Sequence, residues 1–121
     1  MGYMVHHAIV ITSFDEKKLK AAHNKVKKIR SSYAMTVGNV GCWLSPISPA
    51  TTNDYRSFFI APDGSEAGWA ESDKGDRLRN EVIEMLDSFA YADGSNSLKY
   101  AEVQYGDDEN RNYIIRANRC H

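Results

Sequence analysis

The spacing of apolar residues along the chain predicts four strands. Residues 5–12 (VHHAIVIT) are rich in β-branched side chains and have an unbroken apolar centre, which is typical of a central strand. Residues 55–61 (YRSFFIA) form a second apolar run, which ends at a Pro-Asp-Gly turn. Residues 98–105 (LKYAEVQY) alternate like a half-buried strand, and residues 113–117 return after a polar turn. The last two strands are expected to form an antiparallel hairpin.

Two stretches have the spacing of three and four residues that marks an amphipathic helix. The first covers residues 15–30, and its apolar stripe consists of Leu19, Ala22, Val26 and Ile29. Ser13 and Glu16 stand at its start in the spacing of a capping box. The second helix begins at Ser72 or Asp73 and stops near residues 91–94. Its apolar stripe consists of Leu78, Val82, Met85, Leu86 and Phe89.

Residues 31–54 are less regular, because glycines and prolines interrupt short apolar pieces. We expect one short strand here, at residues 34–37 or 40–44. The loop that follows, SPISPATTND, is longer than a hairpin connection, and loops of this kind often carry binding groups. The order β-α-β-β-α-β-β predicts an α+β fold in which two helices pack on one face of a mostly antiparallel sheet.

Length and composition indicate one globular domain, residues 1–121. The hydrophobic share of 42% and the charged share of 26% are ordinary for globular proteins. The first residues do not resemble a secretory signal, and no segment approaches the roughly 18 apolar residues that span a bilayer. With only two cysteines, Cys42 and Cys120, we expect a reducing cytoplasm and no disulfide.

The net charge of -1 conceals a difference between the two halves of the chain. Residues 1–60 carry eight Lys/Arg and three Asp/Glu, a balance of +5, and residues 61–121 carry seven and thirteen, a balance of -6. This polarity would steer an anionic ligand toward one face, or let the basic face of one subunit meet the acidic face of another in a homodimer. Two solvated surfaces of opposite charge are the simpler interpretation.

The first predicted helix is the most basic element of the chain. Its cationic residues are Lys17, Lys18, Lys20, Lys25, Lys27, Lys28 and Arg30. Such a face could contact the phosphates of a nucleic acid, which is one alternative function. Lysine is also a common solvating residue, and no aromatic side chains interleave with these lysines in the sequence to stack bases.

Histidines and acidic residues suggest a second alternative, a small phosphate-handling enzyme that uses His7 with Arg56 and an acidic metal site. His6 and His7 are adjacent on a strand, point to opposite faces and cannot both ligate one metal without a bend. An acidic cluster spans the loop after residues 55–61 and the start of the second helix, and it consists of Asp63, Glu66, Glu71, Asp73 and Asp76. It lacks the register of a calcium loop, and helix capping explains most of it, so we predict no metal and no cofactor. The spacing of Cys42, Cys120 and His121 does not match a zinc knuckle either.

The candidate ligand site consists of Tyr55, Arg56, Trp69 and Arg77, with His7 as a further polar group. Arginine forks bind phosphate or carboxylate, and aromatic planes stack on bases, so these residues would form a nucleotide-sized pocket if the loop folds back over the strand. The structural interpretation is that Trp69 covers the core while the two arginines pair with carboxylates. Those carboxylates would be Asp54, Asp73 or Glu81.

Four segments together resemble a family of small proteins from tailed bacteriophages and prophages. They are HHAIVITS, SPISPATTNDYRSFFIAPDGSEAGW, SDKGDRLR and LKYAEVQYGDD. The resemblance implies a phage origin and a location in the host cytoplasm, and it supplies no catalytic residues. By analogy, it also suggests an accessory or counter-defence protein that sequesters a nucleotide signal without cleaving it. We therefore expect a non-enzymatic binding protein, a homodimer whose ligand is a small anion or a host protein.

Overall fold

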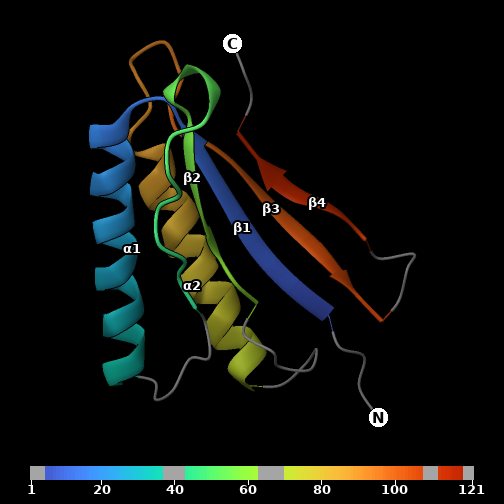
Figure 1. Ribbon diagram of the computed structural model, residues 1–121. Helices are drawn as coiled ribbons and strands as arrows, with labels where there is room; N and C mark the ends of the chain where they lie inside the picture. Colours follow the sequence, from blue (N-terminus) through green and yellow to red (C-terminus); the bar gives the residue numbers. More distant parts are fainter. Residues whose placement is uncertain (1–4, 37–42, 63–69, 108–111, 119–121) are drawn as a thin grey trace.

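The computed structural model describes residues 5–36, 43–62, 70–107 and 112–118, which form one sheet with two helices against it (Figure 1). In chain order the elements are β1 (Val5–Ser13), α1 (Glu16–Thr36), the short 3-10 turn η1 (Thr52–Asp54), β2 (Arg56–Ile60), α2 (Ala70–Asp87), β3 (Lys99–Gly106) and β4 (Tyr113–Ala117). The strand order is β2-β1-β3-β4, and every neighbouring pair is antiparallel. The predicted α+β class is confirmed.

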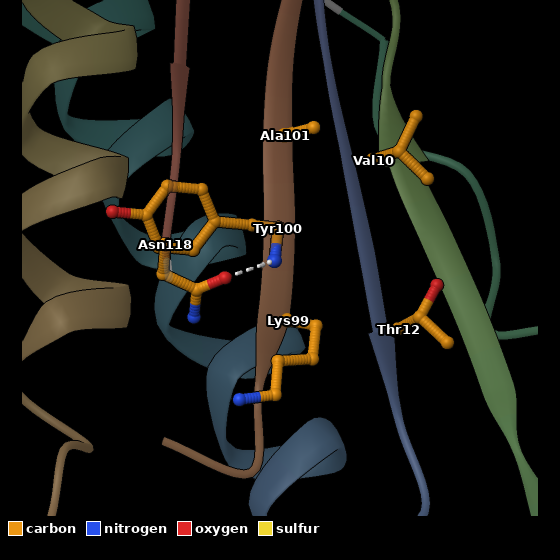
Figure 2. Close-up of a pocket in the computed structure, with 6 residues that line it drawn as sticks. All are labelled: Val10, Thr12, Lys99, Tyr100, Ala101 and Asn118. Atoms are coloured by element: carbon orange, nitrogen blue, oxygen red, sulfur yellow. Dashed lines mark hydrogen bonds between the residues drawn. The ribbon is translucent and has the colours of Figure 1, made fainter. Parts of the chain in front are cut away.

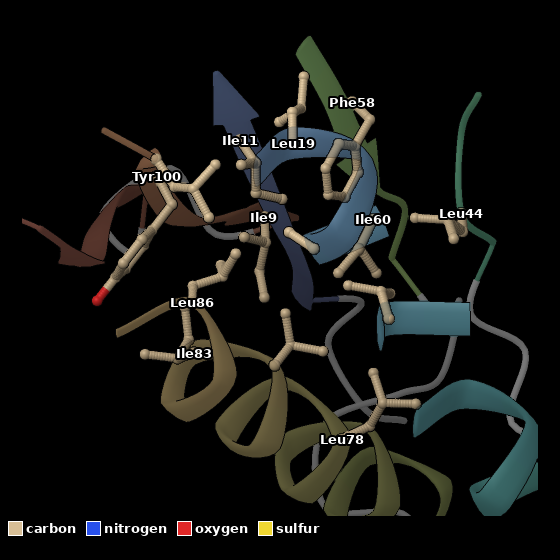
Figure 3. Packing of buried hydrophobic residues seen from close by; sticks show 14 residues of the cluster. Ile9, Ile11, Leu19, Leu44, Phe58, Ile60, Leu78, Ile83, Leu86 and Tyr100 are labelled. Atoms are coloured by element: carbon tan, nitrogen blue, oxygen red, sulfur yellow. The ribbon is translucent and has the colours of Figure 1, made fainter. Parts of the chain in front are cut away.

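Both helices lie on the same side of the sheet, so its two faces have different surroundings (Figure 1). The helix-facing side of β1 presents Ile9 and Ile11, which are completely buried. They pack against both helices and against Phe58 of β2 in one continuous core (Figure 3). The fully buried large side chains of this core are Ile9, Ile11, Leu19, Val26, Phe58, Ile60, Leu78, Val82, Leu86 and Leu98.

The first helix is longer than its apolar stripe predicted, and this overturns one expected strand. Residues 34–36, predicted as a possible strand, belong to the last turn of α1. The other predicted position, 40–44, lies mostly outside the described residues, and Leu44 forms only an isolated bridge with Ile60. The predicted extra strand is therefore absent from the described sheet, because residues 31–36 continue the helix beyond the predicted apolar stripe.

The start of α1 is capped differently from the predicted box. The Asp15 carboxylate accepts a hydrogen bond from the backbone N–H of Lys18 at 3.1 Å, which is the contact of an N-cap residue. The Ser13 hydroxyl accepts one from the Asp15 N–H at 3.0 Å instead. Ser13 thus shapes the turn before the helix, and Asp15 also places a negative charge near the positive helix end.

The outer edge of β2 is covered by the segment at residues 43–48 rather than by a regular strand. The hydroxyl of Ser45 accepts a hydrogen bond from the N–H of Phe59, and that of Ser48 accepts one from the N–H of Ser57. In return the Ser45 N–H donates to the Phe59 carbonyl. Serine side chains therefore replace part of a strand ladder in a segment where Pro46 and Pro49 supply no N–H.

Tyr100 joins the sheet to the end of α2 through its hydroxyl, which donates to the Asp87 carboxylate at 2.7 Å. Burial, and then this hydrogen bond, raise the pKa of Tyr100 above its ordinary value. The buried phenol therefore keeps its proton at a pH where the phenol of the unfolded chain has lost it.

This pKa shift predicts a loss of stability in alkali that depends on Tyr100. Replacing Tyr100 with phenylalanine should lower the free energy of unfolding by about 1–2 kcal/mol at neutral pH. Above about pH 10, Tyr100 ionises in the unfolded wild type but not in the folded protein, and this ionisation stabilises the unfolded state. The difference in the free energy of unfolding between wild type and Tyr100→Phe should therefore shrink as the pH rises. Urea unfolding of both proteins at neutral and alkaline pH measures it. A difference that stays constant across this range would contradict the assignment.

Neither described helix is both long enough and apolar enough to cross a membrane.

Candidate functional site

Three segments that are distant in the sequence form a small pocket at one end of the sheet. Phe14 follows β1, Tyr91 follows α2 and Lys99 begins β3, and the pairing of Thr12 with Lys99 brings these strand ends together. The pocket has a volume of about 220 Å³ and is lined by Phe14, Tyr91, Ser95, Asn96, Ser97 and Lys99. We call it the Lys99 pocket. Its lining contains two aromatic rings, one cation and no carboxylate.

Both aromatic rings of the Lys99 pocket are half-exposed, with Phe14 at 56% and Tyr91 at 52%. Phenylalanine and tyrosine rings that belong to a protein core are normally shielded from water. These two rings are not, so they are available for contact with a ligand. The ammonium of Lys18 lies 3.8 Å from the centre of the Tyr91 ring. A hydrogen bond from Lys18, followed by its charge, lowers the pKa of the Tyr91 hydroxyl. A second cation is therefore close to the pocket, and two carboxylates lie near it as well: Asp15, whose charge raises the pKa of Tyr91, and Asp93, which accepts hydrogen bonds from Ser95.

The structure places one of the predicted ligand residues, Tyr55, next to this pocket. The rings of Tyr55 and Phe14 meet edge to face, with centroids 6.2 Å apart. Arg56 is paired with Glu16 at 3.4 Å, rather than with Asp54 or Asp73 as one interpretation of the sequence had it. Glu16 also accepts Lys20 at 2.7 Å, and a hydrogen bond from Lys20, followed by the charge of Arg56, lowers its pKa. Arg56 is thus partly neutralised in the absence of a ligand.

Lys99 also borders a second hollow, on the face of the sheet away from the helices (Figure 2). This hollow has a volume of about 290 Å³, and its lining residues are Val10, Thr12, Lys99, Tyr100, Ala101 and Asn118. The side chain of Asn118 closes one side by accepting a hydrogen bond from the Tyr100 N–H at 3.0 Å (Figure 2). Lys99 is therefore the cation shared by two adjacent depressions.

A separate group of charged residues lies between α2 and the sheet. The carboxylate of Glu102 on β3 binds the guanidinium of Arg116 on β4, with 2.7 Å between Oε1 and Nε, and lies 3.8 Å from Arg79 on α2. The side chains of Glu102 and Arg79 are each only 4% exposed. Arg79 binds Asp76 at 2.6 Å as well. Because two arginines face two carboxylates, this cluster is balanced in charge and has the character of a structural network.

His7 lies at the edge of that network and not in the Lys99 pocket. Its Nε2 is 3.0 Å from the Gln104 amide oxygen, and its Nδ1 is 3.5 Å from the Asp76 carboxylate. Arg77 follows Asp76 on α2 and is exposed. Because His7 pairs with Gln104 while Arg56 pairs with Ser13, six residues along β1 separate them, or about 20 Å. The described residues therefore do not bring Arg56, Arg77 and His7 into one pocket, and Trp69 lies outside the described part.

The enzyme arrangement considered from the sequence is not assembled in the described part of the chain. It required His7 beside Arg56. His7 lies near the start of β1, whereas Arg56 lies on β2 opposite Ser13, the last residue of β1. No group of three or more His, Cys, Asp or Glu in the described residues is placed to hold a metal ion. Asp63, Glu66, Cys42, Cys120 and His121 fall outside the described residues.

The sequence analysis did not select Phe14 and Tyr91 because each follows the end of an element, and it treated Lys99 only as one position of an alternating strand. It also judged the lysines of α1 to lack aromatic neighbours, but other segments supply them. Lys18 lies against Tyr91, and the ammonium of Lys25 is 5.0 Å from the centre of the Phe89 ring. The one available signal was the position of Phe14, an aromatic residue between a strand and a polar helix start.

Comparisons with known proteins leave the family of the chain open. No protein-family model matches it, and no curated protein matches it. Among solved structures it is similar to the dimeric guanylyl cyclase domain of the RhoGC fusion protein from the aquatic fungus Blastocladiella emersonii, with 14% identity and a TM-score of 0.37 over 96% of this chain and 69% of that one. A monomeric double mutant of that domain matches with 15% identity and a TM-score of 0.32, over 86% and 58%. Likenesses this distant support no conclusion about function.

Proposed function

We propose that this protein is a non-enzymatic binding protein, and that the Lys99 pocket holds part of a small anionic ligand with an aromatic ring, such as a nucleotide. The observation that carries the proposal is the lining of that pocket. It combines two half-exposed aromatic rings with a lysine, and it contains no carboxylate. This set of groups suits a flat base and a phosphate at the same time.

The size of the pocket determines how such a ligand would sit. Sites that enclose a whole small molecule usually measure about 300–1,000 Å³. A pocket of about 220 Å³ holds a single ring system and leaves the rest of the ligand outside. We therefore place the base against Phe14 and Tyr91 and the phosphate beside Lys99, with Lys18 as the second cation near the rings.

The resemblance to phage proteins would give such binding a purpose. A protein that holds a nucleotide without cleaving it would lower the free concentration of a signal in the host cytoplasm, which is a counter-defence role. A host protein as ligand remains the alternative for the same surface, since exposed aromatic side chains also favour protein contacts.

Calorimetric titration of the full chain with AMP, a cyclic dinucleotide, adenosine and inorganic phosphate tests the proposal. The two nucleotides should bind more tightly than adenosine or phosphate, because they engage the rings and the lysine together. Tyr91→Ala should weaken nucleotide binding about 5- to 100-fold, the range expected for the loss of one stacking contact. Lys99→Gln should weaken it about tenfold and leave adenosine binding unchanged.

Lys27→Gln is the matched control, because Lys27 is an exposed lysine on α1, about 16 Å along the helix from Glu16. It should bind AMP like the wild type. Equal affinity of wild type and Lys99→Gln for every nucleotide would refute the proposal. A single-stranded oligonucleotide that binds far more tightly than AMP, with a steep salt dependence whose slope falls by about 1 in Lys27→Gln, would instead support nucleic-acid contact through α1.

A further inference from the structure

The face of the sheet opposite the helices is uncovered in the described part of the chain (Figure 1). Side chains alternate along each strand, so the neighbours of the buried Ile9, Ile11 and Phe58 point away from the core. We call this surface the open face. It consists of His6, Ala8, Val10 and Thr12 of β1, Ser57 and Phe59 of β2, Lys99, Ala101, Val103 and Tyr105 of β3, and Ile114 and Ala117 of β4. Most of these residues are apolar, Lys99 is their single formal charge, and they include no carboxylate.

Large apolar side chains on the open face are exposed to an unusual degree. Val10 is 44% exposed and Ile114 is 63% exposed, although both belong to strands of the sheet. The exposed Trp43 extends the apolar surface beyond the edge of β2, because its ring packs on Phe59 with centroids 5.7 Å apart. A half-solvated antiparallel sheet normally shows water a polar face, so this surface has the composition of an interface.

The area of the open face fits a protein interface better than a single bound ligand. Four strands spaced about 4.8 Å apart and about seven residues long cover roughly 450 Å² in projection. Two such faces would bury about 900 Å² if they were flat. Projecting side chains increase the solvent-accessible area, so the two copies together would bury roughly 1,000–1,200 Å², the size of a small specific interface.

We propose that the open face is the interface of a homodimer, in which two copies of the sheet pack face to face about 10 Å apart. A two-fold axis between the sheets, parallel to the strands and midway between β1 and β3, lays β1 of one copy over β3 of the other. Residues at the same level of the sheet then meet across the interface. The register Val10 with Ala101 and Ala8 with Val103 therefore sets Val10 over Ala101 of the second copy and Val103 over Ala8 of the second copy.

This alternation of large and small residues is what makes the face complementary to itself. Each projecting valine meets an alanine, which is the interdigitation that close packing requires. The same axis lays β2 over β4 of the second copy, so that Phe59, which is level with Val10 and Ala101, meets Ala117 of the second copy. The absence of carboxylates also means that no negative charge is buried unpaired.

The charged halves of the chain are not required for this dimer, in contrast to the arrangement expected from the sequence. Lys99 is half-buried, begins β3 and lies opposite Thr12, so its charge is at the end of the open face and not at its centre. The dimer also does not rest on ligand binding, because Phe14 and Tyr91 of the Lys99 pocket lie outside the open face and Lys99 alone belongs to both surfaces.

Sedimentation equilibrium of the full chain at micromolar concentrations tests the proposal. The wild type should have twice the monomer mass of 13.6 kDa. Val10→Glu should raise the dimer dissociation constant by about 100-fold or more, because it places an unpaired carboxylate at the centre of the interface. Phe59→Glu should do the same from β2. Circular dichroism and a thermal melt establish that each variant folds.

Tyr113→Glu is the matched control, since Tyr113 is an exposed aromatic residue that pairs with Gln104 and so belongs to the helix side of the same sheet. This variant should remain a dimer. A wild type that is monomeric throughout the concentration range would overturn the proposal. A dimer that persists in both folded variants, Val10→Glu and Phe59→Glu, would overturn it as well, because another surface would then hold the copies together.

Discussion

Replacing Glu102 with alanine is expected to lower the free energy of unfolding by about 3–4 kcal/mol. The Glu102 carboxylate is almost fully buried and faces the guanidinium groups of Arg79 and Arg116. Without it, the buried Arg79 guanidinium loses the nearby Glu102 charge and keeps its ion pair with Asp76, so the penalty for its desolvation is less fully offset. Urea unfolding monitored by circular dichroism measures the loss.

Two further variants separate charge from packing. Glu102→Gln keeps the shape of the side chain and an acceptor oxygen, so it should cost about 1–2 kcal/mol. Glu84→Ala removes an exposed carboxylate from α2 and should change the stability by less than about 0.5 kcal/mol. A loss of under about 1 kcal/mol in Glu102→Ala would show that the network contributes little to stability, as many ion pairs do.

Replacing Phe58 with alanine is the second large effect and should cost about 3–5 kcal/mol. The Phe58 ring is 2% exposed and meets the His23 ring edge to face, with centroids 4.9 Å apart. The Nε2–H of His23 donates to the Ser45 carbonyl at 2.8 Å, which ties α1 to the segment along the edge of β2. Loss of the phenylalanine ring leaves a cavity and also removes the support of this buried hydrogen bond.

Phe59→Ala is the control for Phe58→Ala, because the neighbouring residue on β2 points to the open face. At concentrations where the protein is monomeric, it should cost less than about 1 kcal/mol. Urea unfolding of both variants gives the comparison. Equal losses from the two substitutions would mean that the helix side of the sheet is not the main core.

Local periodicity was sufficient for two helices, four strands and the fold class, but it failed for the extra strand expected at residues 34–37 or 40–44. The apolar centre of β1 and the spacing of Leu19, Ala22 and Val26 on α1 reflect which side of each element must leave water, and that requirement acts over a few residues. The ends of elements were less accurate. The helix α1 continues to Thr36 although its apolar stripe stops at Ile29, and Asp15 caps it where a box with Ser13 was expected.

The candidate site was predicted only in part, because its residues come from segments that the sheet order brings together. Tyr55 and Arg56 were chosen for their chemistry; the Tyr55 ring meets Phe14 of the Lys99 pocket, whereas Arg56 is paired with Glu16. Two other expected ligand residues lie elsewhere. His7 is at the far end of β1 from Arg56, and Arg77 is exposed on α2 next to Asp76, which His7 contacts. Phe14 and Tyr91 had no pattern to mark them, since each follows the end of an element.

The sequence by itself determined that β3 has one side with Leu98, Tyr100, Glu102 and Gln104 and another with Lys99, Ala101, Val103 and Tyr105, because alternation is a property of the backbone. Only the tertiary structure decided which side meets the helices. The side with the polar residues is buried, since Arg79 and Arg116 arrive from α2 and β4 to pair with Glu102. The more apolar side is left open. Long-range pairing sets that choice, and a local pattern contains no information about which distant partner a charge will find.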